Sequence, residues 1–379
     1  MSTKQARQSV IFELHFADDA LPDVQDTLFL AGDFNGWHTA DTAFAFKKNR
    51  KGEYTLKAKL LVGQHAYKVV RGSWQTVETD GEGQAIANRT LELEKLAGRT
   101  ALKIVITVVG WADHFPNEPI KSTAASNVEL LDSAFLMPEL NRKRRIWIYL
   151  PQNYTTDTSR RYPVLYMQDG QNVFDEATAF SGEWGVDEYL NSLPAEKQCI
   201  VVAVDNGGND RMLEYNPFNN KQFGKGEGKI YARFLAKVLK PYIDVHYRTK
   251  TEARFTTVAG SSMGGLISYY TAIDYPQVFG SAGVFSPSFW IAPEIYSSTT
   301  KLLPKLDNMG FYFYGGGQEG DSLEQRLGQM TALLKENPSI VTQTVLNPQG
   351  MHQEKYWRLA FDAFYQWLLE WQNEKPLLK

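Results

Sequence analysis

Short runs of partly alternating apolar and polar residues fill the first hundred positions of the chain. Turn residues separate these runs, for example glycine and aspartate at 32–33 and asparagine and glycine at 35–36. Strands of this length and spacing predict a β-sandwich. The predicted strands cover residues 10–16, 27–31, 54–59, 66–70, 90–93 and 102–108.

The pattern changes after about residue 133, where almost wholly apolar runs alternate with helix-like segments. Two of those segments, 230–239 and 356–369, carry apolar residues at helical spacing. Strands this apolar, separated by helices, predict an α/β fold with a mostly parallel sheet covered on both faces. The predicted strands are 146–150, 164–167, 200–204, 256–259, 282–285, 311–314 and 341–346.

A weakly patterned connection separates the two parts, and it contains Pro116, Pro119 and a run of small residues at 122–126. At 379 residues the chain is long enough for two domains, each with its own core. The interpretation is a first domain at 1–110, a linker at 111–132 and a second domain at 133–379.

Composition narrows the choice of partners. The chain has 40 basic and 43 acidic residues and no basic block, so we expect neither a nucleic-acid partner nor a membrane partner. Residues 1–8 lack the apolar core of a secretory signal, and no stretch is long enough to span a bilayer, so the expected location is the cytoplasm. Cys199 is the only cysteine, and its apolar surroundings predict a buried, inert thiol. The sequence gives no indication of the oligomeric state.

Residues 255–266, with the sequence FTTVAGSSMGGL, carry the strongest chemical signal. A β-branched run enters the turn that contains Ser262, and an apolar, helix-compatible segment leaves it. A G-x-S-x-G motif between strand and helix is typical of a nucleophile elbow, in which the serine stands on a strained turn. Gly260 and Gly264 lack a Cβ and let strand and helix come close. The pattern predicts that Ser262 is the nucleophile of a serine hydrolase.

A serine nucleophile needs a base and an acid, which follow it in the chain order serine, acid, histidine when the fold carries this elbow. His352 comes after the predicted strand 341–346, whereas the other histidines precede Ser262. Glu319 lies in a glycine-rich loop after the strand 311–314, and Asp321 is the alternative acid two residues later. Catalytic groups gather at the carboxyl ends of parallel strands, so we expect the three side chains to converge.

Ester hydrolysis also needs hydrogen-bond donors for the oxyanion. The backbone N–H of Met263, which follows the nucleophile, is one predicted donor. The N–H of Gln171 is the second, because it follows the strand 164–167. An ordinary turn built on Asp169 and Gly170 remains the alternative for that loop.

Other motifs do not predict a site. The glycine- and lysine-containing run 224–229 lacks the Walker spacing, and no Cys/His cluster has zinc spacing. The oxygen-rich run 205–210 lacks the EF-hand pattern. We therefore expect no metal and no cofactor, and we expect Arg211 and Glu214 to form an ion pair at the rim of a loop.

Several segments together resemble the putative-esterase (esterase D-like) family of α/β-hydrolases. They are 144–151, 164–172, 239–249, 260–265 and 285–290, and the resemblance covers about residues 133–369. The family includes enterochelin esterases, feruloyl and acetyl-xylan esterases and S-formylglutathione hydrolases. The resemblance implies an α/β-hydrolase fold in which Ser262, Glu319 and His352 act as nucleophile, acid and base. The glutamate departs from the aspartate of many relatives, which keeps Asp321 as an alternative.

The first domain has a resemblance of its own. Residues 28–37, LFLAGDFNGW, with 67–70 and 72–74, are similar to the immunoglobulin-like glycogen-binding modules of branching enzymes and AMP-activated kinase β-subunits. That resemblance implies an immunoglobulin-like sandwich and possible contacts to sugar. A β-turn with a packing tryptophan is the plain alternative, and enterochelin esterases carry a related front domain that serves the esterase. The residues at the matching positions are Trp37, Lys68, Trp74 and Asn88.

These features together predict a serine carboxylic ester hydrolase that works through an acyl-enzyme. Its expected substrates are small acyl esters or acyl and feruloyl sugar esters, with Trp184 and Trp290 among the aromatic contacts. A siderophore trilactone is an alternative substrate. An α-glucan-binding protein with a vestigial esterase domain is the alternative from another functional class.

Overall fold

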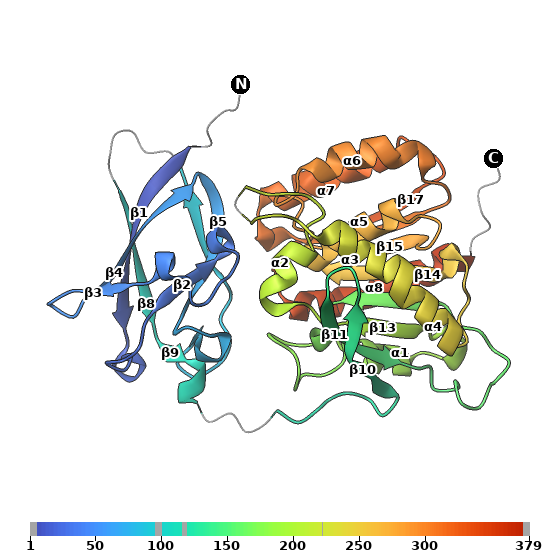
Figure 1. Ribbon diagram of the computed structural model, residues 1–379, viewed down its shortest axis with the longest axis horizontal. Helices are drawn as coiled ribbons and strands as arrows, with labels where there is room; N and C mark the ends of the chain where they lie inside the picture. The colour runs from blue at the N-terminus through green and yellow to red at the C-terminus, as the bar shows by residue number, and fades with distance from the viewer. Residues whose placement is uncertain (1–5, 95–100, 116–119, 222, 374–379) are drawn as a thin grey trace. The chain divides into compact units, whose positions relative to one another are not determined.

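The computed structural model describes residues 6–94, 101–115, 120–221 and 223–373 (Figure 1). The chain forms two compact units, Met1–Pro119 and Ile120–Lys379. Residues 116–119 of the predicted linker lie outside the described residues. The strand β9 (Gly110–Trp111) pairs within the first unit, and β10 (Val128–Met137) begins inside the predicted linker and joins the sheet of the second.

The first unit is rich in β-structure, as predicted. Its strands share one apolar core, to which Phe12, Leu56, Val69 and Ile106 contribute. One sheet has the order β3 (Lys47–Lys48), β4 (Tyr54–Leu61), β1 (Arg7–Phe16) and β8 (Leu102–Val108). A second sheet has the order β2 (Phe29–Gly32), β5 (Gly63–Val70) and β7 (Arg89–Leu93), and β6 (Glu78–Thr79) pairs with β9.

The second unit is built on one large sheet, and the predicted α/β fold with a mostly parallel sheet is confirmed. The first two strands in the sheet order run antiparallel to their neighbours, and all pairs from β13 to β17 are parallel. The order is β10, β11 (Arg142–Tyr149), β13 (Ile200–Val204), β12 (Val164–Gln168), β14 (Thr256–Ser261), β15 (Ser281–Phe285), β16 (Gly310–Gly316) and β17 (Val341–Asn347).

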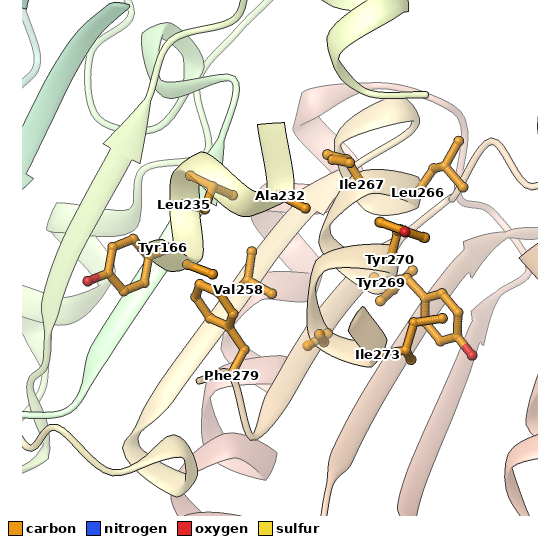
Figure 2. Close-up of a cluster of buried hydrophobic side chains, with 14 of the residues drawn as sticks. Tyr166, Ala232, Leu235, Val258, Leu266, Ile267, Tyr269, Tyr270, Ile273 and Phe279 are labelled. Carbon is orange, nitrogen blue, oxygen red and sulfur yellow. The ribbon is translucent and has the colours of Figure 1, made fainter. Parts of the chain in front are cut away.

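Helices cover both faces of this sheet. On one face, side chains of α3 (Gly228–Phe234) and α5 (Met263–Asp274) meet the strand residues Tyr166 and Val258 (Figure 2). On the other face, Phe361 and Phe364 pack in a second cluster with the strands. The remaining helices are α1 (Val186–Ser192), α2 (Arg211–Glu214), α4 (Lys240–His246), α6 (Glu294–Leu302), α7 (Asp321–Leu334) and α8 (Glu354–Asn373).

The helix predicted at 230–239 is present but is not a regular α-helix throughout. A π-helical turn at Leu235–Leu239 follows α3 and leads directly into α4. The helix predicted at 356–369 is part of α8, which begins two residues earlier and ends later.

A buried histidine fixes the turn that follows β2. The Nδ1 atom of His65 lies 3.1 Å from Asp33 Oδ1, and its Nε2 atom lies 2.8 Å from the carbonyl oxygen of Leu61. Only the imidazolium form donates from both nitrogens. Burial by itself lowers the pKa of His65, but the hydrogen bond and the charge of Asp33, with the bond to Leu61 and the charge of Glu92, raise the pKa above its ordinary value.

We predict that this histidine makes the stability of the first unit depend on pH. A folded-state pKa above the unfolded value gives stabilisation that is full below about pH 6.5 and is lost as the pH rises through the folded-state pKa. The drop in melting temperature caused by His65→Gln should therefore be larger at about pH 6 than at about pH 9. His38→Gln, at an exposed histidine, is the matched control, and equal drops at both pH values would contradict the prediction.

Candidate active site

Ser262 stands on a strained turn between β14 and α5. Its backbone angles are φ 57° and ψ −121°, and its N–H donates to the carbonyl oxygen of Phe285 at 2.9 Å. A Cβ at Gly260 would lie 2.8 Å from the carbonyl oxygen of Gly264, and a Cβ at Gly265 would lie 2.9 Å from that of Phe285. The glycines are therefore required for the close approach of strand and helix, as in a nucleophile elbow.

Glu319 and His352 come together from the loops that follow β16 and β17. The Nδ1 atom of His352 lies 2.5 Å from Glu319 Oε2. The N–H of Gln318 donates to the carbonyl oxygen of Gly350 at 2.9 Å, which joins the two loops through their backbones. A Cβ at Gly316 would lie 2.5 Å from that carbonyl group, so a side chain at this position would push the loops apart.

The alternative acid, Asp321, is the first residue of α7, and its side chain lies outside the described part of the structure. Glu319 is the carboxylate that contacts the histidine. Its side chain is 6% exposed, whereas that of His352 is 41% exposed.

The turn that follows β15 contacts both the predicted nucleophile and the predicted acid. The hydroxyl of Ser286 lies 2.6 Å from Glu319 Oε1, and the indole N–H of Trp357 donates to the same hydroxyl at 3.0 Å. The hydroxyl of Ser288 lies 3.2 Å from the hydroxyl of Ser262. In this segment the sequence predicted a family resemblance and a substrate contact at Trp290, but no role for Ser286 or Ser288.

The predicted nucleophile and the predicted base do not contact each other. Within the described residues no hydrogen bond links Ser262 to His352, and the hydroxyl of Ser262 pairs with Ser288 instead. In enzymes without substrate the hydrogen bonds of the catalytic groups are often long and tighten only in the complex. The hydroxyl of Ser262 would have to leave Ser288 and reach the imidazole of His352 to complete the arrangement.

The two predicted oxyanion donors lie on adjoining segments. Met263 is the first residue of α5, where backbone N–H groups have no partner within the helix. Gln171 lies in the short 3-10 turn after β12, and its side-chain Oε1 accepts a hydrogen bond from the N–H of Asn206 at 3.2 Å. A Cβ at Gly264 would lie 3.0 Å from Asp169 Oδ2, so this turn lies against the start of α5.

Asp169 is the anchor of that turn. Its φ of 55° is unusual for a residue other than glycine, and its carboxylate accepts hydrogen bonds from Arg211 at 2.6 and 2.8 Å and from Asn206 at 2.8 Å. The predicted ion pair between Arg211 and Glu214 is therefore wrong. Glu214 instead contacts Arg142 and Arg144 from β11. Asp169 and the two arginines are all more than 40 positions away from their partners, a distance that sequence spacing does not bridge.

Glu354 ties the oxyanion loop to the region of the histidine. Its carboxylate accepts hydrogen bonds from Asn172 at 3.3 Å and from Ser181 at 2.9 Å. Burial raises the pKa of Glu354 above its ordinary value. The side chain thus fixes the first turn of α8, two residues after His352, against the loop that carries Gln171.

The predicted substrate-binding tryptophans of the second unit differ in exposure. Trp184 is 4% exposed, and its ring packs against Phe285 and Trp357, so it supports the site from within the core. Trp290 is 44% exposed and lies two residues after Ser288. Phe180 is 58% exposed, and its N–H donates to Asn172.

In the first unit, the structure brings two of the predicted sugar-binding residues together. The ring centroids of Trp37 and Trp74 lie 6.1 Å apart, with 40° between the ring planes. The amine of Lys68 donates to the carbonyl oxygen of Ile86, and burial lowers the pKa of this lysine. Asn88 is exposed immediately before β7.

The described residues contain neither a metal-binding cluster nor a membrane-spanning helix. No group of three or more His, Cys, Asp and Glu side chains in that part of the chain could hold a metal ion. None of the helices described is both long enough and apolar enough to cross a bilayer.

Comparison with known proteins identifies the family. A family model described as "Putative esterase" matches residues 137–368. The chain belongs to this esterase family. It is accordingly an ester hydrolase, and the predicted resemblance is confirmed at that level.

Three individual relatives share at most about a third of their aligned residues with this chain. The uncharacterized protein YjcH of Bacillus subtilis is 30% identical over 166 residues, which are 43% of this chain and 64% of YjcH. The endo-1,4-β-xylanase/feruloyl esterase of Xylanibacter ruminicola is 29% identical over 154 residues, or 39% of this chain and 20% of that protein. The solved enterobactin esterase FES of Shigella flexneri has a TM-score of 0.50 at 15% identity and covers 96% of this chain and 93% of its own. At this identity the structural likeness concerns the fold.

We predict that Glu319→Gln lowers kcat for p-nitrophenyl acetate about 10³- to 10⁴-fold, because the amide would hold the imidazole in the wrong tautomer. Asp321→Asn is the matched comparison, and it should stay within about threefold of the wild type if Glu319 alone orients the histidine. The reverse result would transfer the role of the acid to Asp321.

Proposed function

We propose that this esterase is a serine carboxylic ester hydrolase with Ser262, His352 and Glu319 as its catalytic triad. The hydrogen bond between Glu319 and His352 carries the proposal, because it holds the imidazole with a proton on Nδ1. The Nε2 atom is then able to take the proton of a hydroxyl. The three side chains follow β16, β17 and β14, which end at the same edge of a parallel sheet.

The mechanism follows from these positions. His352 removes the proton of Ser262 as the hydroxyl oxygen attacks the ester carbonyl, and Glu319 stabilises the imidazolium that forms. The N–H groups of Met263 and Gln171 stabilise the oxyanion. The imidazolium then gives its proton to the leaving alcohol, and an acyl-enzyme remains. Water, activated by the same histidine, hydrolyses the acyl-enzyme and restores the free serine.

The substrate class proposed first is a small acyl ester or an acyl or feruloyl ester of a sugar. Three exposed apolar side chains support it, since each lies next to a residue of the site. Trp290 lies beyond Ser288, Phe180 beside the oxyanion loop, and Met351 directly before His352. The rings of Trp290 and Phe180 can stack on an aromatic acyl group or on a sugar face. A siderophore trilactone is the alternative substrate, in keeping with the fold shared with FES.

We predict that Ser262→Ala lowers kcat for p-nitrophenyl acetate about 10⁴- to 10⁶-fold while the protein remains folded. Ser297→Ala is the matched control, because Ser297 lies on the exposed side of α6. Circular dichroism checks the fold of both variants. Turnover by Ser262→Ala at the wild-type rate would rule out Ser262 as the nucleophile.

The same assay separates the substrate classes. Wild-type enzyme is offered p-nitrophenyl acetate, a feruloyl arabinose ester and a catecholate trilactone, with Ser262→Ala as the blank for each. If the proposed substrate class is right, kcat/KM is highest for p-nitrophenyl acetate or for the feruloyl arabinose ester. A kcat/KM that is highest for the trilactone would favour the siderophore alternative.

A second function, α-glucan binding by the first unit, is supported by the close pair Trp37 and Trp74. Two partly exposed indole rings at this distance offer a surface on which sugar rings can stack. We predict that maltoheptaose changes the tryptophan fluorescence of the full chain with saturation, and that Trp37→Ala and Trp74→Ala each weaken binding about tenfold. Trp290→Ala on the second unit is the control. If maltoheptaose leaves the fluorescence spectrum of the wild-type protein unchanged, glucan binding is refuted and Trp37 and Trp74 are packing residues.

A further inference from the structure

One turn of the second unit lies between the two halves of the proposed triad. It consists of Ser286, Pro287 and Ser288, directly after β15. The first serine contacts Glu319 and the second contacts the nucleophile Ser262. Glu319 and His352 come from the neighbouring strands on one side, and Ser262 comes from the neighbouring strand on the other.

The hydrogen bonds at Ser286 have a defined direction. An indole N–H can only donate, so the Ser286 hydroxyl accepts from Trp357 at 3.0 Å. A carboxylate can only accept, so the same hydroxyl donates its single proton to Glu319 Oε1 at 2.6 Å. Since Ser286 is 2% exposed and Trp357 4%, water does not compete for these bonds.

The acid is thereby held at both oxygens. Glu319 Oε1 also accepts the N–H of Gly316 at 2.9 Å. Two donors on Oε1 fix the plane of the carboxylate, and Oε2 is left directed at His352 Nδ1. The ring of Trp357 in turn lies edge to face against the imidazole, with centroids 5.1 Å apart.

The backbone at Ser286 supports a role for its hydroxyl. Its φ is 43°, a region in which glycine is relaxed and other residues are strained. A serine in a strained position persists where its side chain makes interactions that glycine could not make. Here those interactions are the hydrogen bonds to Glu319 and Trp357.

We propose that Ser286 is a positioning residue of the esterase reaction, which acts by fixing the carboxylate of Glu319 with help from Trp357. The proposal rests on the triad proposed above. Ser286 itself does not touch the ester. Its contribution is to keep Glu319 Oε2 aligned with the imidazole while His352 gains and loses a proton.

Two substitutions test this role. Ser286→Ala removes the hydroxyl, and Ser286→Gly removes the hydroxyl and also relieves the backbone strain. Both should lower kcat for p-nitrophenyl acetate about 10- to 100-fold with KM within about twofold, because a misaligned base affects the transition state rather than substrate binding. Rates are measured well below the melting temperature of each variant, and Ser297→Ala is again the matched control.

A double-mutant cycle with Trp357→Phe tests whether Trp357 acts on Glu319 through Ser286. The phenylalanine retains a ring beside His352 and lacks the N–H. It should lower kcat less than Ser286→Ala does, because Ser286 can still donate to Glu319. In the Ser286→Ala background it should lower kcat no further. An equal loss in both backgrounds would contradict the proposed sequence of hydrogen bonds.

The outcomes separate this inference from the proposed function. If Ser262→Ala is inactive but Ser286→Ala and Ser286→Gly keep the wild-type kcat, or raise only KM, the triad stands and the role of Ser286 is refuted. If Ser262→Ala retains activity, the triad itself fails. If Ser286→Ala does not fold, Ser286→Gly decides the question, because glycine suits the backbone at this position.

Discussion

The hydrogen bond between Glu319 and His352 is the interaction on which the site depends. It spans two loops that come from neighbouring parallel strands, β16 and β17, and it is possible only because Gly316 and Gly350 let the loop backbones touch. The histidine is 41% exposed, so packing alone would leave its ring several orientations. A buried carboxylate at 2.5 Å selects one of them and determines which nitrogen carries the proton. The orientation of the proposed base, His352, therefore depends on one contact between two loops that neighbouring strands bring together.

A polar layer beneath the exposed base makes this pair rigid. Ser286 and Trp357 hold the acid from one side, and Glu354 fixes the start of α8 on the other. The oxyanion loop has a comparable support, because Asp169 is bound by Arg211 and Asn206. Buried polar groups that are satisfied in this way favour one arrangement of the surrounding side chains, since any other arrangement leaves donors and acceptors without partners.

Much of the fold could be predicted from the sequence, because most strands of the large sheet are continuous apolar runs with both faces buried. The strand β13 was predicted with its observed bounds, and β12 and β14 were within two residues. The edge strand β10 was missed because most of its side chains are not buried and its register with β11 is irregular, so it has no clear alternation.

For the site, the local motif and the chain order indicated Ser262, Glu319 and His352. Ser286 and Trp357 could not be found in this way, since 71 positions separate them. Trp184 was predicted to bind substrate, but no sequence pattern indicates that its ring turns inward to the core.

Backbone strain gives a further reason to locate the site at these strand ends. In the described part of the chain, the residues other than glycine and asparagine with a positive φ are Trp37, Asp169, Ser262 and Ser286. Each of the last three directly follows a strand, and these strands, β12, β14 and β15, are neighbours in the sheet. Each such residue costs about 1–3 kcal/mol unless glycine replaces it, so each needs a compensating interaction. Asp169 has its ion pair with Arg211, and Ser286 has its bonds to Glu319 and Trp357. The side chain of Ser262 contacts only another uncharged hydroxyl, that of Ser288, at 3.2 Å in the described residues, which is the weakest compensation of the three. A strained serine without a strong partner fits a group whose decisive interactions form only when substrate is bound.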